Sequence, residues 1–381
     1  MNRKKPIAVL LSALLCLPAL SALPAAAFDR TRGDLDRNGQ HDRGDCGILC
    51  DWLVNGRTDL DGALADIDAD GRITVKDLSA LKQMILYPEQ EQPQQPEQPE
   101  QPQTHTNASD YMAAVRSSYV TEVPQEILTA EGGELQHITY FSQLANKEKG
   151  AFVWLPPAYD ASQSYPVMYV NHGIFGNEFS MIADFNIVNS AAGLIQKGEA
   201  VPMIIVFTSM YTNPNKDNCD GITAEEEPFY DCFLEDLTEC LMPYVQTHYP
   251  VKTGRENTAV AGFSMGGRES LYIGIKRADL FGYIAASSPA PGVVPAEDQF
   301  CYHPGSMTEA EFRTEAPNNP YLLMIAGGTA DGMVQDSPEK YHNLLTANGT
   351  EHIWISVPGG GHDGSVGVPL FYNFIRALFK A

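Results

Sequence analysis

Ser264 stands at the centre of a Gly-x-Ser-x-Gly pattern that it forms with Gly262 and Gly266. An apolar run at residues 258–262 precedes the pattern and a helical pattern at 266–277 follows it, which is the strand–turn–helix context of a nucleophile elbow. The turn is tight and strained, so only glycine fits beside the serine. It lifts the hydroxyl to the N-terminal end of a helix, whose N–H groups face a developing oxyanion. We therefore predict that Ser264 attacks a carbonyl carbon as a nucleophile.

Asp331 and His362 have the chain order that a serine hydrolase needs, which is serine, then acid, then histidine. Asp331 ends a Gly-rich loop after an apolar run at 321–326, and His362 follows a glycine run after an apolar run at 352–357. Both residues therefore lie just beyond strand C-termini, where α/β sheets build their sites. We expect His362 to take the Ser264 proton and return it to the leaving group, and Asp331 to hold the imidazole tautomer.

Other residues could in principle fill the acid and base roles. Asp336 is expected to cap a helix that begins near residue 338 instead. Asp363 is adjacent to His362 and cannot easily turn back onto it. Asp331 and His362 are therefore favoured. The histidines for which we expect surface or core roles are His342 and His352.

An oxyanion hole needs two N–H donors. The residue after the nucleophile, Met265, supplies one of them. The second is expected from the loop after the apolar run at 166–171, which reads His-Gly-Ile-Phe-Gly. Ile174 N–H is the favoured donor and Gly173 the nearby alternative, and we expect His172 to have a structural hydrogen-bonding role.

These side chains need a scaffold in which strands alternate with helices, and residues from about 110 onward show that alternation. The later apolar runs are nearly continuous, as in a buried parallel sheet. Alternation of this kind predicts an α/β sandwich with a mostly parallel sheet flanked by helices. The expected strands are 136–141, 150–155, 166–171, 203–207, 258–262, 283–287, 321–326 and 352–357, and the expected helices are 186–197, 228–247, 266–277, 338–348 and 369–379.

A separate internal repeat lies near the N-terminus, at residues 34–45 and 66–77. Each copy has oxygen side chains at loop positions 1, 3, 5, 9 and 12 and a glycine at position 6, which is the spacing of an EF-hand calcium loop. Position 7 would contribute its backbone carbonyl. The candidate calcium ligands are Asp34, Asp36, Asn38, Gln40, Asp42, Asp45, Asp66, Asp68, Asp70, Arg72, Thr74 and Asp77.

A helical pattern follows each loop, and six residues at most separate the first loop from the predicted leader. Two loop-plus-helix repeats with aspartate at position 12 resemble a dockerin. The resemblance implies a small all-α module at residues 28–87 that binds structural Ca²⁺ and docks onto a cohesin of a scaffold protein. Calcium would organise the fold, because the clustered carboxylates repel one another without it.

The first 27 residues resemble a secretory signal peptide, with basic residues at 3–5, an apolar run at 7–17 and three alanines at 25–27. We therefore expect a secreted, extracellular protein that carries no membrane anchor. Six cysteines remain after the signal is removed, and their spacing assigns neither a disulfide pairing nor a zinc site.

Residues 88–105 form the expected linker. The segment 88–103 contains no apolar residue and a proline every three or four residues, which favours an extended spacer. The α/β domain then covers 106–381. The chain carries 25 Lys and Arg against 48 Asp and Glu, a formal net charge of −23. This acidity argues against nucleic-acid binding and against docking on anionic lipid.

Four motifs together resemble carbohydrate esterase family 1, which includes feruloyl esterases, acetylxylan esterases and relatives of esterase D. They are His172-Gly-Ile-x-Gly, Gly262-Phe-Ser264-Met-Gly-Gly, Gly-Thr-x-Asp331 and Gly-Gly-Gly-His362-Asp. The resemblance spans most of residues 125–381 and implies an α/β-hydrolase fold and an esterase that needs no cofactor for catalysis.

A hydrolase joined to a dockerin is expected to act on plant cell-wall polymers, which makes an ester side group of xylan the expected substrate. The loop at 208–231 contains several aromatic residues and is expected to border the pocket, which favours a feruloyl ester. An acetylxylan esterase on the same triad is the alternative. A non-catalytic carbohydrate-binding module on this fold is less favoured, because serine, acid and histidine are all present.

Overall fold

The computed structural model describes residues 32–37, 40–41, 45–46, 48–49, 52, 62–67, 72–74, 77, 81 and 108–381. The chain divides into two compact units, Met1–Pro102 and Gln103–Ala381, and each has its own architecture. The expected signal peptide (1–27) and linker (88–105) lie outside the described residues, as do four candidate calcium ligands, Asn38, Asp42, Asp68 and Asp70.

In the first unit, the described residues include helix α2 (Gly62–Ala65) and a small apolar core. Leu49, Ala65, Ile67 and Leu81 are fully buried or almost so. Leu49 and Leu81 belong to the two helical patterns that follow the loops. Their burial agrees with an apolar face on each of these two helical patterns.

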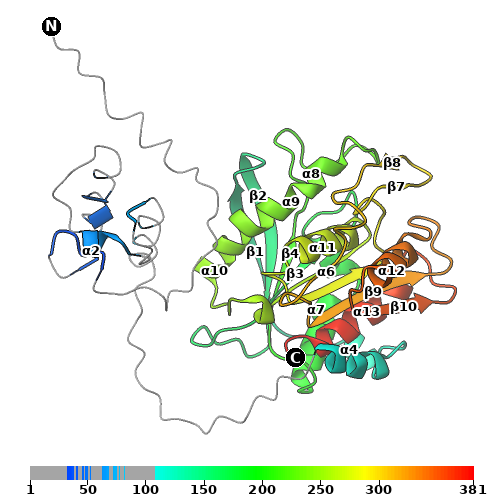
Figure 1. Cartoon of the computed structure of the whole chain (residues 1–381). Coiled ribbons are helices and arrows are strands. Elements are labelled where there is room, and N and C mark those ends of the chain that lie inside the picture. The colour runs from blue at the N-terminus through cyan, green and yellow to red at the C-terminus, as the bar shows by residue number, and fades with distance from the viewer. Residues whose placement is uncertain are drawn as a thin grey trace. The chain divides into compact units, whose positions relative to one another are not determined.

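The second unit is built on an eight-stranded sheet with the order β1-β2-β4-β3-β5-β6-β9-β10 (Figure 1). Only β2 runs against its neighbours, since it pairs antiparallel with β1 and β4 while the other pairs are parallel. All eight expected strands are present. They are β1 (Glu134–Ser142), β2 (Lys147–Leu155), β3 (Val167–Asn171), β4 (Ile204–Thr208), β5 (Thr258–Phe263), β6 (Tyr283–Ser287), β9 (Leu322–Gly328) and β10 (Ile353–Val357).

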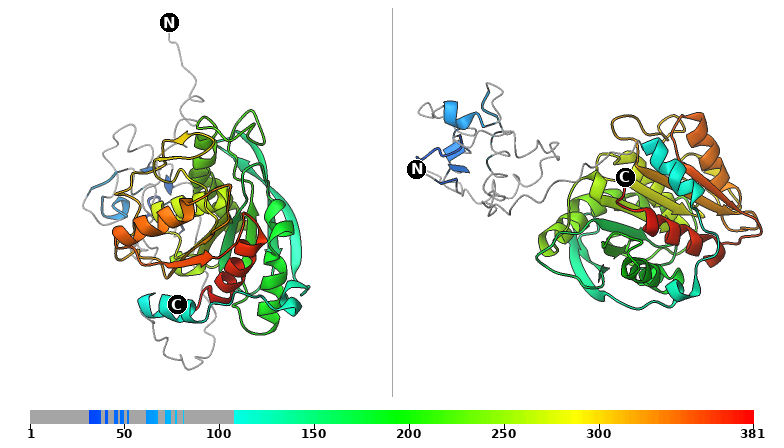
Figure 2. Two further views of the ribbon diagram at one scale, coloured as in Figure 1. Left: turned by 90° about the vertical axis from the view of Figure 1, so that its right-hand side faces the viewer. Right: turned by 90° about the horizontal axis from the view of Figure 1, so that it is seen from below.

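Helices cover both faces of this sheet, as the further views show (Figure 2). Successive residues of the central strands enter two separate cores, because side chains alternate between the faces of a strand. Tyr169 of β3 packs in one core and Met168 in the other. One core contains residues of α9 (Phe233–Asp236), α10 (Met242–His248), α11 (Met265–Lys276) and α12 (Ser337–Ala347), and the other contains residues of α4 (Ala108–Ser117), α7 (Ile187–Gln196) and α13 (Gly364–Ala377). This three-layer arrangement confirms the predicted α/β class.

The expected helix at 228–247 is not continuous. It divides into α8 (Glu227–Asp231), α9 and α10, with a π-helical turn at Leu237–Leu241 before α10. Pro243 lies in the first turn of α10 and has no N–H to donate. A widened turn ahead of this proline accommodates the missing hydrogen bond.

The last helix begins earlier than its expected start at residue 369. α13 starts at Gly364 and contains Pro369. The side chain of Asp363 accepts a hydrogen bond from Ser365 N–H at 2.8 Å, which caps the helix. The N-cap residue therefore directly follows His362, and α13 ends the loop that carries this histidine.

Some short elements were not expected from the sequence. They are α5 (Gln125–Leu128), α6 (Ser180–Asp184) and the hairpin of β7 (Ala296–Glu297) with β8 (Tyr302–His303), in addition to α4. In the part of the chain that the structure describes, no helix has the length and apolar character needed to cross a bilayer.

Candidate active site

The turn between β5 and α11 holds Ser264 in the strained conformation that the sequence predicts. Its φ is 58° and its ψ −119°. A Cβ on Gly262 would lie 2.2 Å from Gly266 O, and a Cβ on Gly266 would lie 2.2 Å from Asn171 O. No side chain fits at either position, because these contacts are with backbone atoms. The glycines are therefore required for the close approach of the chain around Ser264.

The structure brings Ser264, His362 and Asp331 together at the C-terminal ends of β5, β10 and β9. His362 Nε2 lies 2.9 Å from Ser264 Oγ. His362 Nδ1 lies 2.8 Å from Asp331 Oδ2. The arrangement is a continuous hydrogen-bonded path from the hydroxyl to the carboxylate, in which the histidine can accept the serine proton.

Asp331 is fixed from both sides. Its Oδ1 accepts the N–H groups of Met333 at 2.9 Å and Val334 at 3.2 Å, which leaves Oδ2 for His362. Burial raises the pKa of Asp331, but the hydrogen bond and positive charge of His362, with the two backbone N–H groups, outweigh burial and hold the pKa below its usual value. The side chain is therefore a carboxylate near neutral pH and can stabilise a charged imidazole.

The ring of Phe263 packs on His362, with ring centroids 4.5 Å apart. Phe263 is itself supported by Phe185, whose ring centroid lies 4.6 Å away. These contacts limit rotation of the imidazole. No role for Phe263 is predicted from the sequence, although its place inside the elbow motif puts it next to the nucleophile.

The competing candidates make other contacts. Asp363 caps α13, and Asp336 takes the N-cap position of α12 without a side-chain capping bond. Asp336 instead pairs with Lys340, with 2.9 Å between Oδ1 and Nζ. His342 Nδ1 lies 2.7 Å from His352 Nε2. None of these hydrogen bonds involves Ser264.

The expected oxyanion loop passes directly beside the nucleophile. A Cβ on Gly173 would lie 3.5 Å from Ser264 Cβ, and Met265 opens helix α11. Ile174 and Met265 both line the pocket that opens at Ser264. The two residues that carry the expected donors therefore both lie at the Ser264 pocket.

His172 anchors this loop in the structural role that was expected. Its Nδ1 lies 2.7 Å from Gly173 O, and its Nε2 accepts Met210 N–H at 3.1 Å. Burial disfavours the charged ring and lowers the pKa of His172 to about 4. A neutral ring with its proton on Nδ1 satisfies both contacts.

The pocket at Ser264 has a mostly apolar lining with three polar side chains, Ser264, Asp298 and His303. Phe300 is 43% exposed and Met333 42% exposed at its surface. A cavity of this character suits a flat apolar acyl group more than a highly charged one. Its lining residues are Ile174, Ile222, Ser264, Met265, Ala290, Pro291, Asp298, Phe300, His303, Met333 and Val334.

The loop at 208–231 borders the pocket less than expected. Ile222 is its only residue in the lining. Tyr211 and Tyr230 are buried in the core, and Phe229 packs on Tyr211 with ring centroids 5.7 Å apart. The aromatic side chain of the pocket is Phe300 from the β7–β8 hairpin, a segment with no recognisable motif in the sequence.

The two N-terminal loops share one local geometry in their described residues. Asp45 Oδ1 accepts Leu35 N–H at 2.6 Å, and Asp77 Oδ1 accepts Ile67 N–H at 2.7 Å. In both loops the aspartate at position 12 thus reaches the amide at position 2, and both aspartates are fully buried. This agreement supports a true structural repeat.

The first loop also gathers carboxylates. One oxygen each of Asp34, Asp36 and Asp45 lies within 4.8 Å of the others. In the second loop, Asp77 Oδ2 accepts Thr74 N–H at 2.7 Å, and Asp66 lies beside Arg32, with 3.3 Å between Oδ2 and Nη1. Gln40 and Arg72 have exposed side chains, as expected of residues that would contribute only a carbonyl oxygen. An all-oxygen donor set of this kind fits Ca²⁺.

Comparisons with known proteins agree with the α/β unit. Residues 142–371, more than half of the chain, match the family described as "Putative esterase". A solved CE1 ferulic acid esterase from Anaeromyces mucronatus, in complex with ferulic acid, is 40% identical. The alignment covers 69% of this chain and 98% of that enzyme, with a TM-score of 0.66.

Two curated relatives are larger proteins. An endo-1,4-beta-xylanase/feruloyl esterase from Xylanibacter ruminicola is 33% identical over 56% of this chain and 30% of its own length. Endo-1,4-beta-xylanase Y from Acetivibrio thermocellus is 26% identical over 56% of this chain and 18% of its own length. The chain therefore spans less than a third of either curated relative. The family match and the identity across nearly all of the solved enzyme show that this chain belongs to the esterase family and is a carboxylic ester hydrolase.

Proposed function

We propose that this protein is a secreted serine esterase that removes feruloyl groups from xylan in plant cell walls. The observation that carries the proposal is the hydrogen-bonded path from Ser264 through His362 to Asp331 beside an apolar pocket. The relatives support the substrate class, because one is a ferulic acid esterase and another a xylanase/feruloyl esterase.

The reaction would proceed through an acyl-enzyme. Ser264 Oγ attacks the ester carbonyl while His362 Nε2 takes its proton. The tetrahedral oxyanion accepts hydrogen bonds from the N–H groups of Met265 and Ile174, with Gly173 as the alternative second donor. The intermediate collapses, and His362 gives its proton to the departing sugar hydroxyl. Water, deprotonated by His362, then releases the acid and restores Ser264.

The pocket lining favours a feruloyl over an acetyl group. Phe300, Met333 and Val334 offer apolar contact to an aromatic ring. An acetyl group is too small to reach all of these side chains, so it would gain less binding energy from the same cavity. An acetylxylan esterase remains the second candidate because its chemistry at Ser264 would be identical.

The test of substrate class is a comparison of kcat/KM for methyl ferulate, acetylated xylan and a simple acetyl ester, with the full chain. We expect methyl ferulate to be the best of the three. A preference for acetylated xylan would replace this assignment with the acetyl one. No hydrolysis of any of the three would contradict both.

We also propose that residues 28–87 are a dockerin that binds structural calcium and attaches the enzyme to a cohesin of a cellulosome. The repeated position-12 contacts of Asp45 and Asp77 and the grouped carboxylates of the first loop support this proposal. Calorimetry of the full chain should detect calcium binding, and a chelator should weaken capture by immobilised cohesins. Capture that is unchanged in chelator across cohesin types would contradict it.

A further inference from the structure

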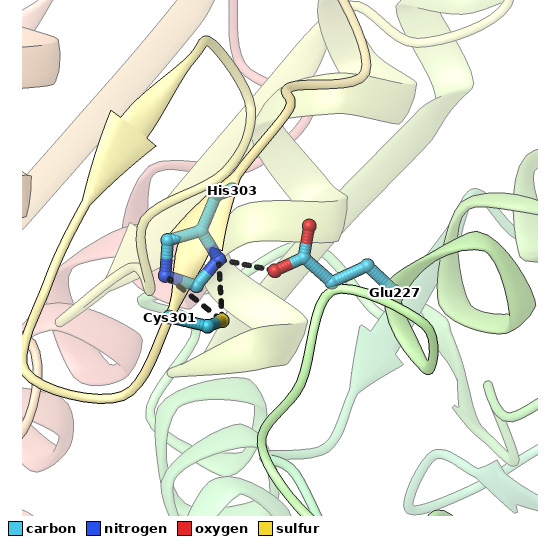
Figure 3. A group of neighbouring side chains, drawn as sticks. All are labelled: Glu227, Cys301 and His303. Atoms are coloured by element: carbon cyan, nitrogen blue, oxygen red, sulfur yellow. Dashed lines mark hydrogen bonds and ion pairs between the residues drawn. The ribbon is translucent and has the colours of Figure 1, made fainter.

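A second cluster of chemically active side chains lies beside the pocket. It consists of Glu227, Cys301 and His303, and one donor atom of each lies within 4.8 Å of the others (Figure 3). Glu227 opens helix α8, while Cys301 and His303 belong to the β7–β8 hairpin. We propose that these three residues bind a zinc ion that ties α8 to the hairpin.

The donor atoms already face one another. His303 Nδ1 contacts Glu227 Oε1, and Cys301 Sγ lies 3.9 Å from each ring nitrogen (Figure 3). Tetrahedral zinc has bonds of about 2.0–2.3 Å, which places donors roughly 3.3–3.7 Å apart. Small movements of the three side chains therefore create the site. The ion takes the place of the proton between His303 and Glu227 and of the Cys301 thiol proton, so two protons leave as Zn²⁺ enters.

The second nitrogen of His303 has the partner that a zinc-bound histidine needs. His303 Nε2 lies 3.3 Å from Asp298 Oδ1. Asp298 is held in turn, because its Oδ1 accepts the N–H groups of Phe300 at 2.7 Å and Cys301 at 3.0 Å. A carboxylate on the distal ring nitrogen fixes the tautomer and the orientation of a ligating histidine. Nδ1 is therefore the metal-binding atom.

Burial and charge favour a cation at this place. Glu227 is 4% exposed and His303 2% exposed, and Glu227 Oε2 accepts no hydrogen bond from the described residues. The nearby Arg268 lies 3.8 Å from that oxygen and is itself paired with Asp231 at 2.6 Å. A buried carboxylate oxygen that accepts no hydrogen bond and has only this long ion pair is costly, and a bound cation would lower that cost.

The donor set distinguishes this zinc site from the calcium sites proposed for the N-terminal loops. Thiolate, imidazole and carboxylate suit Zn²⁺, whereas Ca²⁺ and Mg²⁺ prefer oxygen alone. Asp298 and His303 also line the pocket at Ser264. A zinc ion here would fix the pocket wall and would take no part in the chemical step.

The test uses the full chain, stripped of metal and then kept in saturating calcium so that the N-terminal loops are filled. Zinc affinity is measured by competition with a chromophoric chelator, and Co²⁺ is added separately to look for the thiolate-to-cobalt charge-transfer band. The variants are Cys301→Ser, Asp298→Asn and, as a matched control, Cys232→Ser, another half-buried thiol outside the cluster.

We expect one zinc ion per chain that is lost or bound at least about tenfold more weakly in Cys301→Ser, and a roughly 10–100-fold weakening in Asp298→Asn. The cobalt band should be present in the parent and in Cys232→Ser and absent from Cys301→Ser. Circular dichroism without added zinc checks that each variant folds. Equal zinc affinity in the parent and Cys301→Ser, or no cobalt band in the parent, would overturn the proposal. Neither result bears on the proposal that Ser264 hydrolyses esters, which is tested separately by its activity.

Discussion

The substitution Asp331→Asn tests the roles of the two carboxylate oxygens separately. Oδ1 accepts two backbone N–H groups, from Met333 and Val334, so the amide oxygen of asparagine must take that place. The amide NH₂ then faces His362 Nδ1, which must accept rather than donate. The proton of the neutral ring moves to Nε2, and His362 can no longer take a proton from Ser264.

The expected loss follows from this wrong tautomer. Misplacing the proton in a serine triad lowers kcat by about 10⁴, which is about 5.5 kcal/mol in the activation barrier. The assay is kcat and KM on methyl ferulate at neutral pH, and we expect KM to change little because Asp331 is not in the pocket lining. The matched control is Asp363→Asn, next to His362, where asparagine can still cap α13.

If Asp331→Asn keeps a kcat within about tenfold of that of the parent, this reasoning is refuted. Equal losses in Asp331→Asn and Asp363→Asn would also refute it, because they would point to a disturbed His362 loop. Thermal unfolding of both variants separates a catalytic loss from a loss of fold.

Three further outcomes are expected. His172 has a folded pKa of about 4 against an ordinary value of 6.5, so the unfolded chain takes up a proton at this residue first as the pH falls. By pH 4.5 the free energy of unfolding should therefore drop by about 2.5 kcal/mol in the parent, a loss that His172→Gln does not suffer. Equal pH dependence of urea unfolding in both proteins would contradict this. Gly266→Ala should unfold or lose several kcal/mol in thermal denaturation, because its Cβ would meet Asn171 O at 2.2 Å, whereas Gly332→Ala, with open space around it, should be tolerated. Phe300→Ala should raise KM for methyl ferulate by about tenfold and leave a simple acetyl ester nearly unchanged, and a parallel change for both esters would argue against ring contact.

The scaffold and the triad could be predicted because their signals are local. The six parallel strands are short, mostly apolar runs, and β1 and β2 show a weaker mixture of polar and apolar residues. The sheet places the C-terminal ends of its parallel strands at one edge. The elbow glycines, the acid after β9 and the histidine after β10 are each visible within a few residues of a strand. Chain order then joins them, although they are far apart in the sequence.

The pocket wall could not be predicted in this way. Phe300 and His303 reach the site because the β7–β8 hairpin folds back over it, and no residue spacing encodes that path. The aromatic residues of the 208–231 loop carried a misleading signal, because Tyr211 and Tyr230 fill the core. The helix α13 starts before the expected residue 369, because Asp363 caps it at Ser365 N–H and Pro369 is accommodated inside the helix.

The most direct test of the central claim is the Ser264→Ala substitution, assayed on methyl ferulate. Ser264 Oγ is the atom within 2.9 Å of His362 Nε2, and alanine removes it without enlarging the side chain. We expect kcat to fall by about 10⁶ while the protein keeps its circular dichroism spectrum and its affinity for the ester. A folded Ser264→Ala protein that retains kcat within about tenfold of the parent would contradict nucleophilic catalysis at this residue.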